Sequence, residues 1–340
     1  MKSIVYDRVG DPSVLRLVER KIPEPGSGEV RVRVVVSGLN PSDWKARWGR
    51  AGRMAFPEIT PHIDGAGFID AIGPGVAGRA VGERVWVYLA AIEQPTGTAQ
   101  EYTVLPAGRV VPLPDGVSFD AGACVGAPAM TAHWALTVAE NGPRRLAPGA
   151  LDDVTVLVAG GAGAVGNAAI QLARWSGATV IATVSSPEKA ALATAAGAHH
   201  VVNYREGDPA AKIRAYASRG VDVIVELAFA PNAALDSAIL APNGTIAIYG
   251  DDGGNTARID LRACLARNAR LQFLVLYSAG QDVLHAAASD INAALVANAL
   301  RFGEGHGLPL IRYPLARTAD AHAAVEAGVT GKVLVDVTPA

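Results

Sequence analysis

The sequence predicts an α/β fold in which a doubly wound parallel (Rossmann) sheet is inserted into a β-rich domain. A glycine-rich turn, Gly161 to Gly166, lies between an apolar run and an amphipathic helical pattern. After about residue 125, strand-like and helical segments alternate, whereas before it short β-rich segments alternate with turns rich in Pro and Gly. Alternating strands and helices form parallel sheets, and many short strands joined by turns form antiparallel barrels or sandwiches.

Six strands with helical crossovers are expected after this shift, enough for a complete doubly wound sheet. These strands are expected at residues 154–159, 179–184, 200–203, 221–227, 245–249 and 271–276. Helices are expected to begin near Ala164, Pro187, Pro209 and Pro231, followed by a long helix at 281–302 and strands at 310–314 and 332–337. In the β-rich part, strands are expected at 29–36, 65–72, 84–90 and 99–105.

The turn Gly161-Ala162-Gly163-Ala164-Val165-Gly166 has the Gly-x-Gly-x-x-Gly spacing of dinucleotide-binding units. The first glycine permits a tight turn, the second lets the backbone approach a pyrophosphate, and the third allows close packing of helix on strand. The N-terminus of the following helix offers free N–H groups to the phosphates. Gly160, Ala164 and Val165 are therefore predicted, with the three glycines, to contact a bound dinucleotide.

The end of the strand at 179–184 predicts which nucleotide is bound. Folds selective for NAD carry Asp or Glu there, which holds the ribose 2′-hydroxyl. This chain has Ser185 and Ser186 instead, followed by Pro187, Glu188 and Lys189. Without an acid, nothing repels a 2′-phosphate, and the two serines and Lys189 are predicted to hold one, so NADPH is the expected cofactor. Alternatively, one serine only caps a helix, and both roles are compatible.

Composition excludes several other classes of function. The net charge of −2 over 340 residues gives no basic footprint for nucleic acid or an anionic membrane surface. No apolar run reaches the roughly 18 residues of a membrane span, and the N-terminus lacks the apolar core of a signal peptide. The two cysteines, Cys124 and Cys264, make no disulfide framework. We therefore expect a cytoplasmic protein without nucleic-acid or membrane partners.

Six short segments carry a resemblance to a known family. They are Gly38-Leu39-Asn40-Pro41-Ser42-Asp43, Pro61 to Gly67, Pro128-Ala129-Met130-Thr131-Ala132, Gly160 to Gly166, Gly197 to Tyr204, and Gly331-Lys332-Val333-Leu334-Val335. Together the chain resembles the zinc-free medium-chain dehydrogenases/reductases, within them the zeta-crystallin-like NADPH:quinone oxidoreductases. The resemblance implies a GroES-like catalytic domain at 1–125 and 277–340, a Rossmann NADPH-binding domain at 126–276, and a homodimer formed through the nucleotide domains.

The resemblance also implies roles for individual residues. Asn40 and Thr131 are expected near the nicotinamide, although Asn40 can equally be a turn residue before Pro41, and Thr131 can cap or pack a helix. Tyr204 is expected near the adenosine 2′-phosphate, and Lys332 of the Gly-Lys segment is assigned to the cofactor. The carboxyl ends of the last two strands, where this fold binds ligands, add Tyr249, Gly250, Phe273 and Leu274.

Residue types at the metal-binding positions predict no metal ion. Zinc-dependent relatives need a cysteine near Ser37 and a histidine at the position of Ile63. His62 is one residue too early and is interpreted as a loop residue. The four closely spaced cysteines of a structural zinc lobe are missing between residues 84 and 105.

Hydride transfer from NADPH to a quinone needs neither a metal nor a nucleophile, and it is the predicted reaction. Reduction of an alkene also needs a proton, for which Asp43 is a candidate, although a charged loop residue is usually solvated. An enone or enoyl-thioester reductase on the same scaffold is the first alternative. An NADPH-binding structural protein is the second.

Overall fold

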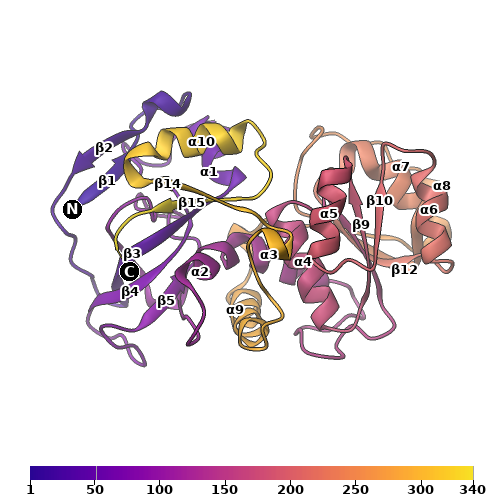
Figure 1. Cartoon of the computed structure of the whole chain (residues 1–340), viewed down its shortest axis with the longest axis horizontal. Coiled ribbons are helices and arrows are strands. Elements are labelled where there is room, and N and C mark those ends of the chain that lie inside the picture. Colours follow the sequence, from indigo (N-terminus) through magenta and orange to yellow (C-terminus); the bar gives the residue numbers. More distant parts are fainter. Residues whose placement is uncertain (51, 340) are drawn as a thin grey trace. The chain divides into compact units, whose positions relative to one another are not determined.

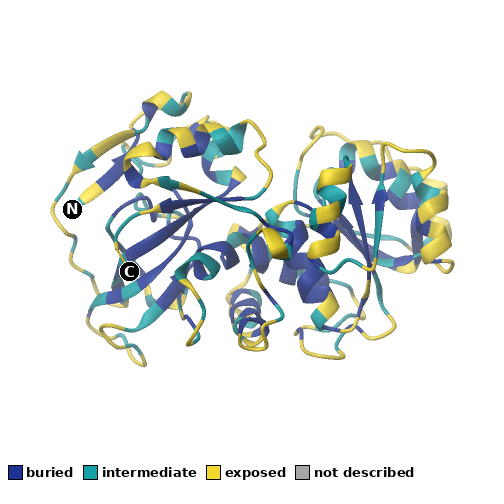
Figure 2. Cartoon of the chain, in the orientation of Figure 1, coloured by how far each residue is buried: buried dark blue, intermediate teal, exposed yellow. Residues whose placement is uncertain are grey.

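The computed structural model describes residues 1–50 and 52–339, and it divides the chain into two compact units (Figure 1). Unit 1 consists of Met1–Ala127 and Leu310–Ala340, and unit 2 of Pro128–Pro309. Within each unit the strands are mostly buried, and the outward faces of helices such as α5, α6 and α10 are exposed (Figure 2).

Unit 1 is built on a seven-stranded sheet of order β14-β15-β3-β4-β5-β7, with β6 paired to β3. Its strands are β3 (Glu29–Leu39), β4 (Asp64–Ile72), β5 (Arg84–Val87), β6 (Tyr102–Pro106), β7 (Val110–Pro112), β14 (Leu310–Pro314) and β15 (Lys332–Asp336). A separate hairpin pairs β1 (Lys2–Val5) with β2 (Arg16–Glu19). The helices are α1 (Pro41–Arg47), α2 (Phe119–Val125) and α10 (Thr318–Glu326), with short 3₁₀ turns η1 (Pro12–Val14), η2 (Ala107–Arg109) and η5 (Leu315–Arg317).

The pairing in this sheet is antiparallel except between β14 and β15, which are parallel. The strand expected at 84–90 ends at Val87, because Leu89 adopts a left-handed φ of 53° that a strand cannot continue through. The helix α2 packs so closely on β3 that a Cβ at Gly38 would lie 2.1 Å from the carbonyl oxygen of Ala123. Only glycine fits there.

Unit 2 contains a six-stranded parallel sheet of order β10-β9-β8-β11-β12-β13, the doubly wound order that the sequence predicts. Its strands are β8 (Thr155–Ala159), β9 (Thr179–Val184), β10 (His200–Asn203), β11 (Val221–Glu226), β12 (Leu240–Ile248) and β13 (Arg270–Phe273). Its helices are α4 (Ala164–Trp175), α5 (Pro187–Ala195), α6 (Pro209–Tyr216), α7 (Phe229–Ile239), α8 (Leu261–Arg267) and α9 (Gln281–Val296), with 3₁₀ turns η3 (Leu276–Ser278) and η4 (Glu304–His306). The helix α3 (Ala127–Thr137) begins at the last residue before the unit boundary.

Most of the helix starts agree with those expected from the sequence. The exception is α7, which begins at Phe229, so that Pro231 lies inside its first turn. Proline is tolerated there, because the first N–H groups of a helix have no intrahelical partner. The expected helix at 281–302 ends at Val296, and Asn298 follows with a left-handed φ of 54°.

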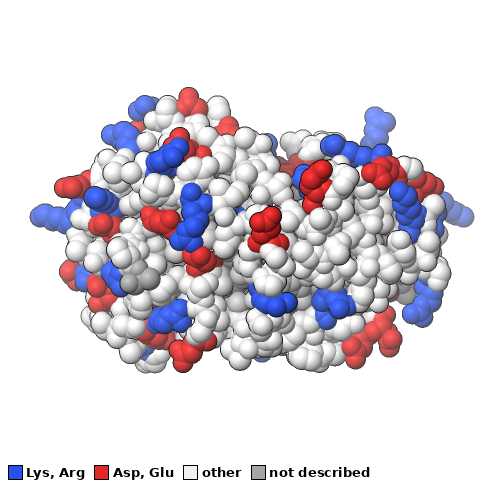
Figure 3. Space-filling model, viewed as in Figure 1, with Lys and Arg blue, Asp and Glu red and all other residues white. Residues whose placement is uncertain are grey.

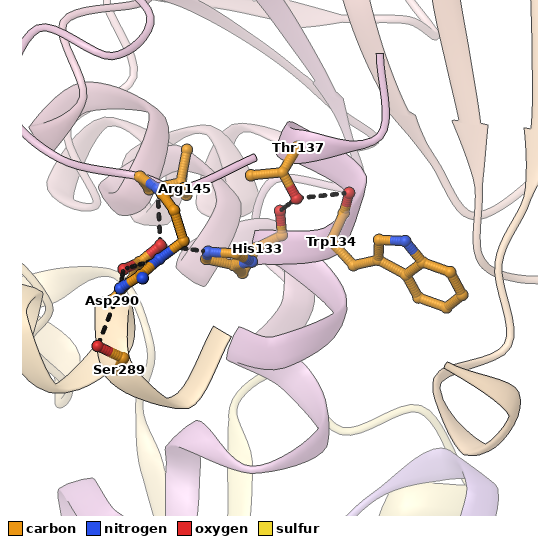
Figure 4. Close-up of polar contacts among 7 residues, drawn as sticks. His133, Trp134, Thr137, Arg145, Ser289 and Asp290 are labelled. Carbon is orange, nitrogen blue, oxygen red and sulfur yellow. Dashed lines mark hydrogen bonds and ion pairs between the residues drawn. The ribbon is translucent and has the colours of Figure 1, made fainter. Parts of the chain in front are cut away.

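The division between the units differs from the expected one, because residues 277–309 belong to unit 2 rather than to the β-rich part. The helix α9 is fixed there by Asp290, whose buried carboxylate accepts hydrogen bonds from His133 Nε2 at 2.8 Å and Leu146 N at 2.7 Å (Figure 4). Arg145 Nε adds a charged hydrogen bond to the same carboxylate at 2.8 Å. These partners hold the pKa of Asp290 at about 2, against the cost of burial.

Lysine, arginine, aspartate and glutamate side chains are interspersed over both units on the face shown in Figure 3. Among the described residues, none of the helices has the length and apolar character needed to cross a bilayer.

Candidate active site

The glycine-rich turn of unit 2 links β8 to α4 and leaves no room for a side chain at Gly160, Gly161 or Gly166. Gly160 has a left-handed φ of 67°, and a Cβ at Gly166 would lie 2.4 Å from the carbonyl oxygen of Gly160. A Cβ at Gly161 would lie 2.8 Å from that of Ala182 on β9. The turn therefore brings backbone, rather than side chains, to the start of α4.

The start of α4 fits the pyrophosphate of a dinucleotide. Gly163 is the N-cap and has no side chain to bond the first N–H groups of the helix. The N–H groups of Ala164 and Val165 therefore have no intrahelical partner and remain available to an anion. The structure thus places all the residues predicted for this loop in one turn.

The end of β9 carries hydroxyl groups and an ammonium group, with no acid at the strand terminus. Ser186 is the N-cap of α5 and accepts a hydrogen bond from Lys189 N at 3.3 Å, so its capping role is real. Tyr204 lies beside this terminus, because its N–H donates to the carbonyl of Val184 at 3.0 Å, and its side chain is 46% exposed. Ser185, Ser186, Lys189 and Tyr204 therefore gather at one edge of the sheet.

The carboxyl ends of the last strands lie beside the same loop. Tyr249 N donates to the carbonyl of Glu226 at 2.9 Å, and a Cβ at Gly250 would lie 2.7 Å from the carbonyl oxygen of Leu227. Leu227 in turn covers Gly160, whose Cβ would lie 2.7 Å from Leu227 Cδ2. On β13, the side chain of Phe273 is 65% exposed, while that of Leu274, just beyond the strand, is buried.

A buried pair of carboxyl groups at the end of β11 was not predicted. Glu226 accepts hydrogen bonds from Ala228 N and from Asn232 Nδ2, and it faces Asp236 on α7. Both oxygens of Asp236 are buried, and neither has a hydrogen-bond partner among the described residues, so the neutral, protonated form of this carboxyl is favoured. Burial, and then the charge of Glu226, raise the pKa of Asp236 to about 9. The available signal was an acid that follows the apolar run Val223-Ile224-Val225 at the end of β11.

In unit 1, three of the residues from the family motifs form one buried polar cluster. Asn40 Nδ2 donates to Asp64 Oδ2 at 2.7 Å, and Lys332 Nζ donates to Asn40 Oδ1 at 2.6 Å. The Lys332 ammonium also lies 3.9 Å from Asp64, and all three side chains are at most 4% exposed. Both oxygens of Asp64 lie 2.9 Å from Ala127 N. We call this set the Asn40–Asp64–Lys332 cluster.

Asp43 is buried at the start of α1 rather than solvated, so the solvated interpretation is wrong. Its Oδ2 accepts a hydrogen bond from Asn40 N at 2.7 Å, which caps the helix. Burial raises the pKa of Asp43 to about 7, although hydrogen bonds from Asn40 and Ile63 backbone groups oppose the rise. Asn40 is likewise the N-cap of α1, so its turn role and its side-chain contacts coexist.

His62 lies in the turn before β4, but its side chain is fully buried rather than an ordinary loop side chain. Its Nδ1 is 2.8 Å from Ser37 Oγ and its Nε2 is 3.0 Å from His322 Nε2. Burial, and then the charge of Lys332, lower the pKa of His62 to about 3.

These residues do not fit a zinc site. Both nitrogens of His62 are already engaged, Ile63 occupies the ligand position, and burial raises the pKa of the nearby Cys124 thiol to about 12. A ligating cysteine must be a thiolate. No group of three or more potential metal-binding side chains occurs among residues 1–50 and 52–339.

Thr131 lies on α3 in unit 2 and is half-buried. Of the predicted catalytic residues, Asn40 and Asp43 belong to unit 1, and Thr131 belongs to unit 2.

Comparison with known proteins gives full-length matches. The family model described as alcohol dehydrogenase GroES-like domain matches residues 26–115, and the one described as zinc-binding dehydrogenase matches residues 164–292. Quinone oxidoreductase of Sus scrofa is 30% identical, over 98% of this chain and 97% of its own. The 2-haloacrylate reductase of a Burkholderia species is 28% identical, over 95% of this chain and 94% of its own. A mycobacterial protein solved in complex with NADPH is 29% identical with a TM-score of 0.82, over 98% of this chain and 99% of its own.

The carboxyl pair at the end of β11 makes the stability of unit 2 depend on pH. Because the folded pKa of Asp236 is raised, its contribution is fully present below the unfolded pKa of about 4 and is lost as pH rises toward about 9. We expect the free energy of unfolding to fall from pH 6 to pH 9, by at most about 1.4 kcal/mol per pH unit from this proton.

The substitution Asp236→Asn supplies Glu226 with an amide donor and should flatten this slope, as measured by urea unfolding across the same range. Asp208→Asn is the matched control, because Asp208 is an exposed helix cap for which Asn serves equally well. Parallel slopes for wild type and Asp236→Asn would contradict the raised pKa of Asp236.

Proposed function

Because the chain belongs to the medium-chain dehydrogenase/reductase family, we propose that this oxidoreductase reduces quinones with NADPH, by direct hydride transfer and without a bound metal ion. The observation that carries the choice of cofactor is the end of β9, where Ser185, Ser186 and Lys189 stand without an acid. The relative solved with NADPH and the curated quinone oxidoreductase support the same reading.

The residues of unit 2 would hold the cofactor in three groups. The turn Gly160, Gly161, Gly163, Ala164, Val165 and Gly166 would bind the pyrophosphate, and Ser185, Ser186, Lys189 and Tyr204 the 2′-phosphate. Tyr249, Gly250, Phe273 and Leu274 would line the cofactor at the strand ends, and Thr131 would contact the nicotinamide. When bound, NADPH supplies the hydride.

In unit 1, the Asn40–Asp64–Lys332 cluster fixes the orientation of the Asn40 amide. Because Nδ2 donates to Asp64 and Oδ1 accepts from Lys332, the amide cannot flip without losing both bonds. One N–H of the amide remains unassigned, and we propose that it binds the nicotinamide or a substrate oxygen. Lys332 acts in this scheme by holding Asn40.

Asp43 is the proposed proton-holding group of unit 1. A pKa of about 7 lets this carboxyl carry a proton at neutral pH, which an ordinary aspartate does not. Reduction of a quinone can take its protons from water, so Asp43 matters most if the substrate is an alkene, where the enolate left by hydride addition must be protonated.

An alkene reductase is the second candidate, favoured by one observation. A relative of similar length is named 2-haloacrylate reductase, and that name denotes a substrate with a carbon–carbon double bond. Both candidates use the same cofactor and the same residues. We also propose a reducing, cytoplasmic location, since Cys124 and Cys264 are both free thiols.

Oxidation of NADPH with a panel of acceptors separates the two candidates. We expect turnover with 1,4-quinones and less with enones, 2-haloacrylates and enoyl thioesters, followed at the absorbance of NADPH. Turnover of an alkene, with no turnover of any quinone, would contradict the quinone reductase and favour the alkene reductase. Prior dialysis against a chelator should leave the rate unchanged, because no residue at the metal positions fits zinc.

The substitution Lys189→Ala tests the choice of cofactor. It should raise KM for NADPH by about tenfold or more, the loss of one charge-assisted hydrogen bond of roughly 1.5–3 kcal/mol, and leave KM for NADH nearly unchanged. Lys212→Ala, which removes an exposed lysine on α6, serves as the control. Equal effects of Lys189→Ala on both cofactors would remove its assigned role.

We propose that the chain forms a homodimer through unit 2. The strand β13 is the last in the sheet, so one of its edges lacks a partner strand within the described chain. Apolar side chains stand exposed around it: Leu261 is 66%, Leu265 72%, Phe273 65% and Val275 56% exposed. An unpaired edge with such neighbours is suited to pairing with the same edge of a second copy.

Light scattering after size exclusion tests the dimer. Wild type should have twice the chain mass of 35.0 kDa, and Leu265→Asp should shift toward the single-chain mass. Val296→Asp is the control, because Val296 is 71% exposed on α9 and outside this surface. A monomeric wild type would contradict the proposal.

A further inference from the structure

A chain of buried hydrogen bonds runs through unit 1 from the end of α1, by way of α10, to the start of β4. Its members are the side chains of Arg47, His322, His62, Ser37 and Thr98, all fully buried. Arg47 Nε lies 3.4 Å from His322 Nδ1, and His322 Nε2 lies 3.0 Å from His62 Nε2. His62 Nδ1 lies 2.8 Å from Ser37 Oγ, and Ser37 Oγ 2.7 Å from Thr98 Oγ1. The chain ends at the backbone of Asp64, whose carbonyl accepts the Thr98 hydroxyl at 2.6 Å.

The donors in this chain can be assigned from its far end. The hydroxyl proton of Thr98 is used on the carbonyl of Asp64, so Thr98 Oγ1 must accept from Ser37. The proton of Ser37 is then used as well, so Ser37 Oγ accepts from His62 Nδ1–H. With its proton on Nδ1, the neutral His62 ring accepts at Nε2, and His322 donates from Nε2.

The other end of the hydrogen-bond chain, at Arg47, independently gives the same position for the proton of His322. An arginine only donates, so His322 Nδ1 accepts from Arg47, which again leaves the His322 proton on Nε2. Arg47 is anchored in turn by the carboxylate of Glu326, at 2.6 Å. Both rings are therefore neutral, and every donor in the chain has an acceptor.

The chain holds His62 in a backbone conformation that a histidine rarely adopts. Its φ is 78°, in the left-handed region, which costs a residue with a Cβ roughly 1–2 kcal/mol. The His62 carbonyl accepts Thr98 N at 3.0 Å, so main chain and side chain are fixed together. Such an outlier persists where its surroundings determine it, and here the determinants are the two ring contacts.

His62 lies two residues before Asp64, which belongs to the Asn40–Asp64–Lys332 cluster. Asp64 receives the last hydrogen bond of the chain at its carbonyl, while its carboxylate holds Asn40. We propose that His62 and His322 are positioning residues, which fix Asp64 and through it the amide of Asn40. The inference rests on the proposed function only in assigning Asn40 to the reaction.

Substitutions at two positions test this role. His322→Gln keeps an amide donor for His62 and an acceptor for Arg47, whereas His322→Leu removes both. His62→Gly removes the ring but suits the left-handed φ, so it folds without backbone strain. We expect His322→Leu and His62→Gly to lower kcat by about tenfold or more, with KM for NADPH within about twofold, and His322→Gln to restore kcat.

Ala321→Gly is the matched control for stability. Ala321 is fully buried on α10 beside His322 but takes no part in the hydrogen bonds, so this variant loses stability while retaining kcat. Comparison is made at a temperature at which every variant is folded. Wild-type kcat in both His322→Leu and His62→Gly would overturn the positioning role, and equal loss in Ala321→Gly would reduce it to general stability.

A second readout does not depend on turnover. Nitrogen-15 NMR of labelled histidine should report a proton on Nδ1 of His62 and on Nε2 of His322 at pH 7. The side-chain amide signal of Asn40 should move in His322→Leu and return in His322→Gln. An unmoved Asn40 signal, or the opposite tautomers, would overturn the inference even in an active enzyme. A wild type inactive with all acceptors but showing these signals would instead overturn the proposed function.

Discussion

The carboxylate of Asp64 is the interaction on which the arrangement of unit 1 depends. It is fully buried, so its charge must be satisfied by nearby donors, and these come from three distant segments of the chain. Asn40 donates from the start of α1, Lys332 approaches from β15, and Ala127 N donates where the chain leaves unit 1. The backbone at Gly126 approaches this carboxylate so closely that a Cβ there would lie 2.1 Å from Asp64 Oδ1. Removing this carboxylate would leave Asn40 Nδ2 and Ala127 N without this acceptor, and would leave the Lys332 ammonium without the carboxylate 3.9 Å from it.

Unit 2 shows how much of a fold local patterns determine. The strands β9 and β10 and the starts of α4, α5 and α6 coincide with the sequence predictions, because each is marked by an apolar run, a glycine turn or a proline in the first helical turn. The right-handed crossovers that such units require limit the possible strand orders. Residues 277–309, which were expected in the catalytic domain, lie in unit 2, where the contact between Asp290 and His133 joins residues 157 positions apart. No local pattern reports such a pair.

The candidate site was predictable to the same degree. Backbone geometry at Gly160 to Gly166 follows from the glycines, since a Cβ at Gly161 or Gly166 would lie within 2.8 Å of another atom. Asn40, Asp64 and Lys332 each lie in a short segment that was recognised in the sequence. That they meet in one cluster depends on the pairing between β3, β4 and β15. The burial of the His62 side chain was not predicted, because a lone histidine in a loop gives no sign of its partner, and His322 is 260 residues away. The buried Glu226–Asp236 pair was missed although Glu226 follows directly on an apolar run.

The ammonium of Lys332 makes the charge balance of the Asn40–Asp64–Lys332 cluster independent of metal ions in the medium. In the cluster it provides the positive charge beside a buried carboxylate that a bound cation would otherwise provide. This cation is covalently part of the polypeptide, so it is present from the moment the chain folds and does not exchange with the medium. Scarcity of trace metals, or competition among them, therefore leaves the charge balance of the cluster untouched. Its weak point is chemical instead: acylation of one amine would remove the charge entirely, and only burial at 2% exposure protects it.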